Sequence, residues 1–139
     1  GMSDACTEKG HRNDNFYSAI LHNQVAYHDF EGITVMDDEK PRLVANLGDK
    51  PLLILRNHGL LACGRTIPEA FINLWSLERS CEVQVTCDST NQPMIPVPNE
   101  VLERSEQLMA KQSMGNPLGE LEFSAFVRII DKIDSSYKN

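Results

Sequence analysis

The longest helix predicted by the hydrophobic pattern begins near residue 66. Its apolar residues recur at steps of three and four: Ala70, Phe71, Leu74, Trp75, Leu77, Cys81 and Val85. Thr66 and Glu69 have the spacing of a capping box, and Pro68 suits a first helical turn because the N–H groups of that turn have no helical partner. The apolar stripe requires cover, so we expect this helix to pack on a sheet.

Three segments that precede this helix are predicted to contain strands. Residues 51–55 form a continuous apolar run, which is typical of a strand covered on both faces. Residues 60–63 form a second short run between two glycines. Residues 25–35 are rich in β-branched and aromatic residues and are expected to form one or two short strands interrupted at Gly32.

Further helices are predicted at residues 15–23, 41–48, 101–111 and 118–133. Short strands therefore come first and long helices later, which favours an α/β fold with a layered sheet and packed helices. Residues 15–139 are expected to form one domain, or part of one. Residues 1–14 are polar, and Gly1 before Met2 resembles a tag-cleavage scar, so we expect a disordered N-terminus there.

Composition narrows the classes of partner. The 139 residues carry a formal net charge of −7, and the sequence pI is near 5.0. This charge repels a phosphate backbone, so nucleic acid is not an expected partner. The apolar runs are far shorter than the roughly 20 residues that cross a bilayer, and no charged and then apolar leader precedes them. We therefore expect a cytoplasmic protein that does not contact a membrane.

The four cysteines show neither the paired spacing of a zinc site nor the context of a secreted disulfide framework. Cys81 and Cys87 are predicted to share one helix, where a step of six residues places them about 240° apart around the axis. They are therefore unable to bridge each other. We expect all four, Cys6 and Cys63 included, to be reduced thiols that behave as small buried residues.

Four stretches occur in an order and at a spacing specific to one family. They are VAYHDFEGI (25–33), LILRNHGLLACGRTIPEAF (53–71), LERSCEVQV (77–85) and FVRIIDKIDSSY (126–137). Together they resemble the class II aldolase/adducin family, in the branch that contains the adducin head. The resemblance implies a three-layer fold around a largely antiparallel sheet, assembly as a tetramer, and a divalent metal, typically zinc, held by three histidines.

The resemblance makes His58, in RNHG, the third of these metal-binding histidines. In catalytic members the metal polarises the oxygens of an enediolate, so that a carbon–carbon bond is cleaved or formed or carbon dioxide is lost. The other two histidines form an H-x-H motif, and no such pair occurs among His11, His22, His28 and His58. The chain therefore resembles only the C-terminal half of the family domain.

A catalytic zinc ion needs about three protein ligands, and one imidazole does not hold it against water. The family's acid/base glutamate and phosphate-binding loops also belong to the half that carries H-x-H. We therefore assign no catalytic residue and expect this chain alone not to bind the metal. A symmetric assembly could still group copies of His58 or pair it with a neighbour's His28. His28 itself is interpreted as structural, because strand alternation points it away from Asp29.

Two classes of function follow. In the first, the domain is not catalytic alone and acts as an oligomerisation or binding module, whose partner is a second copy or a complementary N-terminal half. In the second, it is part of a metal-dependent aldolase or decarboxylase of small hydroxy or keto acids, completed by another chain. We favour the first, because the YHDFEGI stretch is most similar to the non-catalytic adducin head and the other metal ligands do not occur here.

Overall fold

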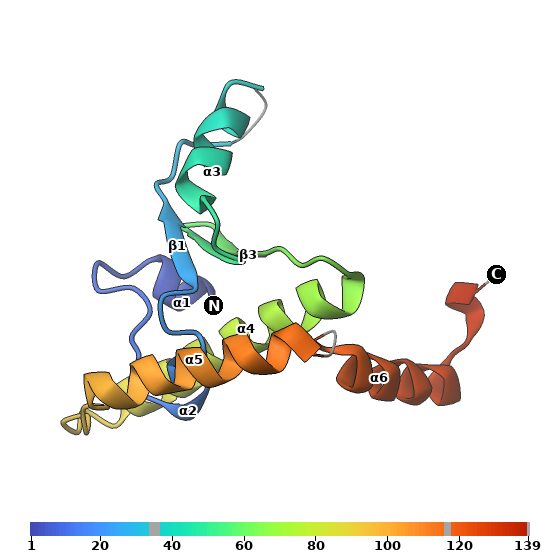
Figure 1. Cartoon of the computed structure of the whole chain (residues 1–139). Coiled ribbons are helices and arrows are strands. Elements are labelled where there is room, and N and C mark those ends of the chain that lie inside the picture. Colours follow the sequence, from blue (N-terminus) through green and yellow to red (C-terminus); the bar gives the residue numbers. More distant parts are fainter. Residues whose placement is uncertain (34–36, 116–117, 139) are drawn as a thin grey trace.

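The computed structural model describes residues 1–33, 37–115 and 118–138. Its elements follow in the order α1 (Met2–Ala5), α2 (Phe16–Ile20), β1 (Val25–His28), α3 (Glu39–Leu47), β2 (Leu52–Leu55), β3 (Gly59–Ala62), α4 (Ile67–Ser89), α5 (Asn99–Gly115), α6 (Glu120–Ile133) and a 3-10 turn η1 (Ser136–Lys138). The predicted α/β fold, a layered sheet with packed helices, is confirmed (Figure 1).

The sheet has three strands in the order β1-β2-β3, with β2 in the centre. β1 pairs with β2 in parallel, with Ala26 opposite Leu53 and His28 opposite Leu55. β2 and β3 are antiparallel, and a tight loop joins Leu55 to Gly59. The segment predicted as one or two strands forms the single strand β1 among the residues that are described, while residues 34–36 lie outside them.

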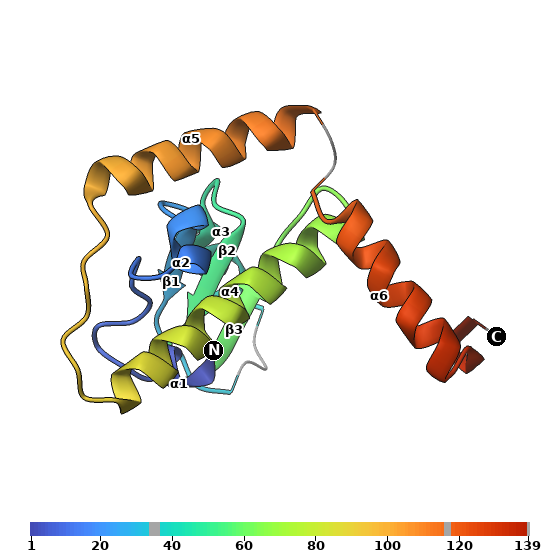
Figure 2. The ribbon, with the colours of Figure 1, turned by 90° about the horizontal axis from the view of Figure 1, so that it is seen from below.

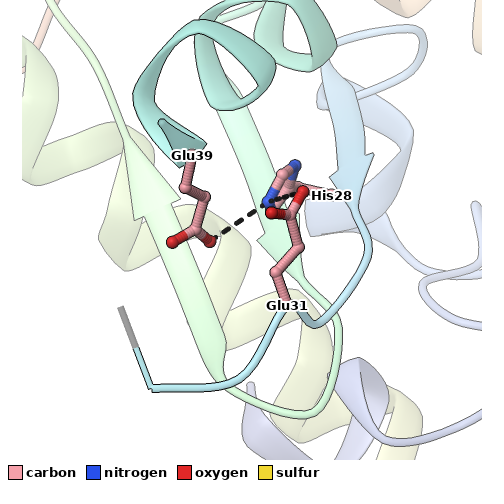
Figure 3. Close-up of side chains that lie close together, drawn as sticks. All are labelled: His28, Glu31 and Glu39. Carbon is pink, nitrogen blue, oxygen red and sulfur yellow. Dashed lines mark hydrogen bonds and ion pairs between the residues drawn. The ribbon is translucent and has the colours of Figure 1, made fainter. Parts of the chain in front are cut away.

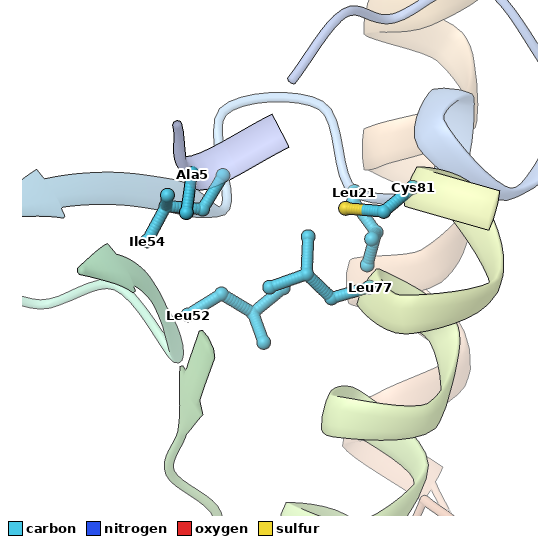
Figure 4. Packing of buried hydrophobic residues seen from close by; sticks show 6 residues of the cluster. All are labelled: Ala5, Leu21, Leu52, Ile54, Leu77 and Cys81. Carbon is cyan, nitrogen blue, oxygen red and sulfur yellow. The ribbon is translucent and has the colours of Figure 1, made fainter. Parts of the chain in front are cut away.

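Helices cover both faces of the sheet, and alternation along β2 divides its side chains between the two sides. Leu52 and Ile54 point to the face covered by α1, α2 and α4, where both are fully buried (Figure 4). Their cluster is completed by Ala5, Leu21, Leu77 and Cys81. Leu53 is buried on the opposite face, where α3 contacts β1. The prediction that both faces of β2 are covered is therefore confirmed.

The start of α4 agrees with the sequence prediction in position, while its capping differs in one bond. The hydroxyl oxygen of Thr66 accepts a hydrogen bond from the backbone N–H of Glu69, at 3.2 Å. The Glu69 carboxylate accepts from the backbone N–H of Arg65, at 2.8 Å, rather than from Thr66. The guanidinium of Arg65 also pairs with this carboxylate. The second bond of a capping box is thus replaced by a bond to the preceding residue.

The buried face of α4 is more polar than the predicted stripe. Its buried residues are Ser76, Leu77, Ser80, Cys81 and Gln84. Leu74 and Val85, which the periodicity assigned to the buried stripe, are exposed. Burial of Ser80 and Gln84 requires hydrogen-bond partners, because an unpaired polar group is costly to bury. Those partners come from the N-terminal segment.

Residues 1–14, for which the sequence predicts disorder, pack against α4 and the sheet in the structure. α1 packs on α4 and β3, and Ala5 is buried in the core. The side-chain amide of Gln84 donates to the Asp4 carboxylate at 2.6 Å and to the Gly10 carbonyl at 2.8 Å. His11 contacts the Ser80 hydroxyl at 2.6 Å. The N-terminal segment thus supplies the hydrogen-bond partners of the polar residues that are buried on α4.

The last two helices lie outside the sheet layers. α5 contacts α2, and α6 contacts the first part of α4 and otherwise extends away from the body of the molecule (Figure 2). The α6 contact consists in part of Phe71 on α4 against the rings of Phe123 and Phe126, each at 5.4 Å between centroids. Within the described residues, no helix is long and apolar enough to cross a bilayer.

Leu77→Ala is expected to lower the free energy of unfolding by about 3 kcal/mol, because deletion of a fully buried leucine side chain leaves a cavity beside Leu52. Urea unfolding, followed by the fluorescence of Trp75, measures the change. Leu74→Ala is the matched control on the same helix, where the side chain is 41% exposed, and it should cost less than about 1 kcal/mol. Equal costs for the two variants would contradict the position of the core.

Candidate functional site

His58 lies in the loop between β2 and β3. Asn57 adopts a left-handed conformation, with φ of 56°, which lets the chain reverse within three residues. The backbone N–H of Asn57 donates to the Ala5 carbonyl at 3.0 Å, and that of His58 to the Leu55 carbonyl at 3.1 Å. The loop is therefore anchored, while the side chain of His58 is exposed and has no hydrogen-bond or ion-pair partner among the described residues.

The four histidines occupy separate environments. His11 is held by Ser80, and burial lowers the pKa of its imidazole. His22 lies 3.1 Å from the Asn13 amide. His28 is buried at the end of β1, on the face covered by α3. Within the described part of the chain, the structure does not bring the predicted metal ligand His58 together with any group of metal-binding side chains.

His28 is instead the centre of a polar cluster formed with two glutamates (Figure 3). Its Nε2 lies 3.3 Å from Oε1 of Glu39, the first residue of α3, and 3.7 Å from Oε1 of Glu31 in the segment after β1. The side-chain amide of Asn46, near the end of α3, lies 2.8 Å from Nδ1. The partners of His28 come from α3 and from the segment after β1, rather than from Asp29.

Arg42 supplies the positive charge of the cluster. Its guanidinium donates to both carboxylate oxygens of Glu31, which lowers the pKa of that carboxyl group. Arg42 also lies 3.6 Å from the Asp38 carboxylate. Glu39 has no arginine or lysine partner among the described residues, and its side chain is 12% exposed. Two carboxylates, those of Glu31 and Asp38, thus share one guanidinium, while the Glu39 carboxylate lies beside the buried imidazole of His28.

Glu31, Glu39 and Asn46 were missed by the sequence analysis, although one signal was present. Residues 39 and 46 are seven apart on one helix, which is about two turns, so both face the same side. Two polar residues on the side of a helix that packs on the sheet could have indicated a polar cluster around His28, which lies in that sheet. The helix predicted over residues 41–48 does not include Glu39, so this spacing is not evident from the sequence prediction.

A separate cavity of about 460 Å³ lies between α2, α4, α5 and the start of α6. Tyr17, Leu21, Trp75 and Met109 form much of its apolar wall, and Glu106 and Glu122 lie at it as well. None of the described residues that line it is a histidine or a cysteine. The cavity is therefore a different feature from both His58 and the His28 cluster.

Comparison with known families decides the assignment. The model of the class II aldolase and adducin N-terminal domain matches residues 5–85, more than half of the chain. The chain belongs to this family. A Pseudomonas aeruginosa protein with the provisional name aldolase class 2 protein is 34% identical over 99% of this chain and 54% of its own length. Rat alpha-adducin is 38% identical over 83% of this chain and 17% of its own length.

Solved structures agree with this assignment of the class II aldolase/adducin chain. A crystal structure of an aldolase II superfamily protein from Pseudomonas syringae superposes with a TM-score of 0.91 and 32% identity, over 100% of this chain and 55% of that one. An L-fuculose 1-phosphate aldolase from Glaciozyma antarctica shares the fold, with a TM-score of 0.73 and 24% identity. The chain spans about half the length of the bacterial relatives and structures that it matches.

The residues present do not fit the three-histidine metal site that the resemblance implies. His58 is at the surface of its loop, and His11, His22 and His28 are each engaged elsewhere. A zinc ion at His58 would have one protein ligand from the described residues, where about three are needed. We therefore derive no chemical step through a metal at His58.

Proposed function

We propose that this segment of a class II aldolase/adducin domain acts as an oligomerisation or binding module and is not catalytic alone. The observation that carries this proposal is the environment of His58. Its imidazole lies exposed at a loop, and no second metal-binding side chain of the described residues accompanies it. A Lewis-acid metal and a proton-transfer group are both needed for the family's lyase chemistry.

The proposal places these residues in the C-terminal half of the family domain, in the branch that resembles the adducin head. The similarity to rat alpha-adducin over 83% of this chain supports that placement. Bacterial proteins named after aldolases match 99% and 87% of this chain, and the activity of such a longer protein is a separate proposal.

An exposed apolar face on α6 supports the proposal that the segment is an oligomerisation or binding module. Phe126, Ile129, Ile130 and Ile133 recur at steps of three and four, and each is at least 40% exposed. Phe123 and Phe126 contact Phe71 on α4. Beyond its contact with α4, α6 extends away from the body of the molecule (Figure 2). An apolar stripe of this spacing is the pattern by which one helix packs against another. We propose that a second copy covers it, or a complementary N-terminal half.

The second candidate function is a metal-dependent aldolase or decarboxylase of small hydroxy or keto acids, completed by another polypeptide. The exposure of His58 favours it, because an imidazole at the tip of an anchored loop is accessible to ligands from a partner. In that arrangement His58 would contribute one metal ligand, and the partner would contribute the H-x-H pair and the acid/base group.

Incubation of the segment alone with hydroxyacyl or sugar phosphates and added zinc should give no retro-aldol turnover above background. A coupled aldehyde assay, run with and without a chelator, measures it. Reproducible turnover that is abolished both by the chelator and by His58→Ala would contradict the proposal. His22→Ala is the control, because His22 contacts Asn13 and not the loop that carries His58.

A further inference from the structure

The ligand atoms of the His28 cluster have the spacing of a metal site. Nε2 of His28 lies 3.3 Å from Oε1 of Glu39 and 3.7 Å from Oε1 of Glu31, and the three atoms lie within 4.8 Å of one another (Figure 3). Tetrahedral zinc, with bonds of about 2.0–2.1 Å, places its ligands about 3.4 Å apart. We propose that His28, Glu31 and Glu39 bind one zinc-type divalent cation, at a site separate from His58.

The cluster also has outer partners that a metal site requires. Ligands are normally held by further hydrogen bonds, which set the orientation of the imidazole and the carboxylates. The Arg42 guanidinium donates to both oxygens of Glu31 and leaves Oε1 a second lone pair for the cation. The Asn46 amide lies against Nδ1 of His28 and holds the ring from its other side. Two of the three ligands are therefore already oriented.

Rotation of one amide switches the imidazole between two forms. With the Asn46 nitrogen donating to Nδ1, the proton of neutral His28 is on Nε2 and points to Glu39. Exchange of the amide nitrogen and oxygen lets Nδ1 donate to Asn46 and frees the Nε2 lone pair. That lone pair would face two carboxylates, which is unfavourable unless a cation lies between them. Cation binding thus selects the Nδ1-protonated tautomer without net loss of a proton from His28.

The charges favour a cation at this position. Glu31, Glu39 and Asp38 are balanced by Arg42 alone among the described residues that pair with them. A divalent cation would neutralise the remaining negative charge beside a buried imidazole, where the low dielectric strengthens the interaction. Its ligands come from β1, from the segment after β1 and from the first residue of α3. The cation would therefore tie α3 to the sheet.

Zinc titration by calorimetry tests this site. The experiment uses the full chain after chelator treatment and buffer exchange, with Cys6→Ser and Cys63→Ser as background, because an exposed cysteine thiolate is a zinc ligand that would compete with the site. We expect one zinc ion per chain. Glu39→Gln, which keeps the shape of the ligand, should weaken binding by about 100-fold or more, and Asn46→Ala by about 10-fold to 100-fold. Cobalt should give the intense visible absorption of a tetrahedral site.

His22→Ala is the matched control and should leave zinc binding unchanged, because His22 contacts Asn13 and lies outside the cluster. Long-range ¹H–¹⁵N spectra of the imidazoles should show the His28 proton move from Nε2 to Nδ1 when zinc is added. Zinc affinity that survives Glu39→Gln, or that is lost in His22→Ala, would overturn the site. A shift of the thermal midpoint by zinc in the background chain, absent in the folded Glu39→Gln variant, distinguishes lost binding from lost fold. Failure of the site leaves the proposed module function untouched.

Discussion

Cys81 is expected to react with alkylating agents at pH 8 at least about 50-fold more slowly than a free cysteine. Burial, and to a smaller degree the neighbouring Asp4, raise the pKa of the Cys81 thiol to about 12. With a free thiol near pKa 8.5, the thiolate fraction at pH 8 falls by roughly 2,000-fold. The greater nucleophilicity of a high-pKa thiolate restores a factor of roughly 40, and the fully buried position adds steric protection.

Mass spectrometry after timed iodoacetamide treatment measures this difference within one chain. Cys6 and Cys63 are exposed and serve as internal references. Their exposure also corrects the expectation that all four cysteines are small buried residues, which holds for Cys81 but not for these two, because both follow the ends of short elements at the surface. Alkylation of Cys81 at the rate of Cys63 in the folded chain would show that α4 is not packed as described.

The double variant Ile129→Glu and Ile133→Glu is expected to shift the chain from an assembly to a monomer. Both side chains belong to the exposed apolar face of α6, where Ile129 is 53% and Ile133 is 75% exposed. Two buried and unpaired carboxylates at a helix–helix contact would each cost several kcal/mol, which exceeds what such an interface supplies. Sedimentation velocity at micromolar concentration measures the shift.

Val44→Glu is the matched control, because this valine is equally apolar and exposed but lies on α3. It should leave the sedimentation coefficient of the assembly unchanged. The circular dichroism of the double variant should remain that of the parent chain, since no core residue is altered. An assembly that persists in the double variant and dissociates in Val44→Glu would move the interface from α6 to α3.

The regular elements were predictable from sequence where one local pattern decides them. β2 follows from an uninterrupted apolar run, and α4 from its Thr66 cap and helical periodicity. Which side of α4 is buried was not predictable in this way, because the buried side includes polar residues that the apolar periodicity leaves out. Ser80 and Gln84 are buried because segments about 70 residues away supply their partners, and no local pattern reports such a contact. The packing of residues 1–14 was missed for the same reason.

Of the two candidate sites, one was predictable from a local sequence motif and the other was not. His58 was found because a family motif surrounds it, and the structure adds that its loop is anchored and its side chain exposed. The cluster around His28 was missed because its members come from three segments that only the fold brings together. α4 contacts β2, α3 contacts β1, and an exposed apolar surface lies on α6.

The central claim, that this segment is an association module, is tested most directly by multi-angle light scattering of the unaltered chain at micromolar concentration. The exposed apolar face of α6 predicts a dimer or a larger assembly, unless a complementary polypeptide covers that face instead. The mass of one 15.6 kDa chain, combined with cooperative unfolding and no binding of a polypeptide that carries the H-x-H half, would contradict it.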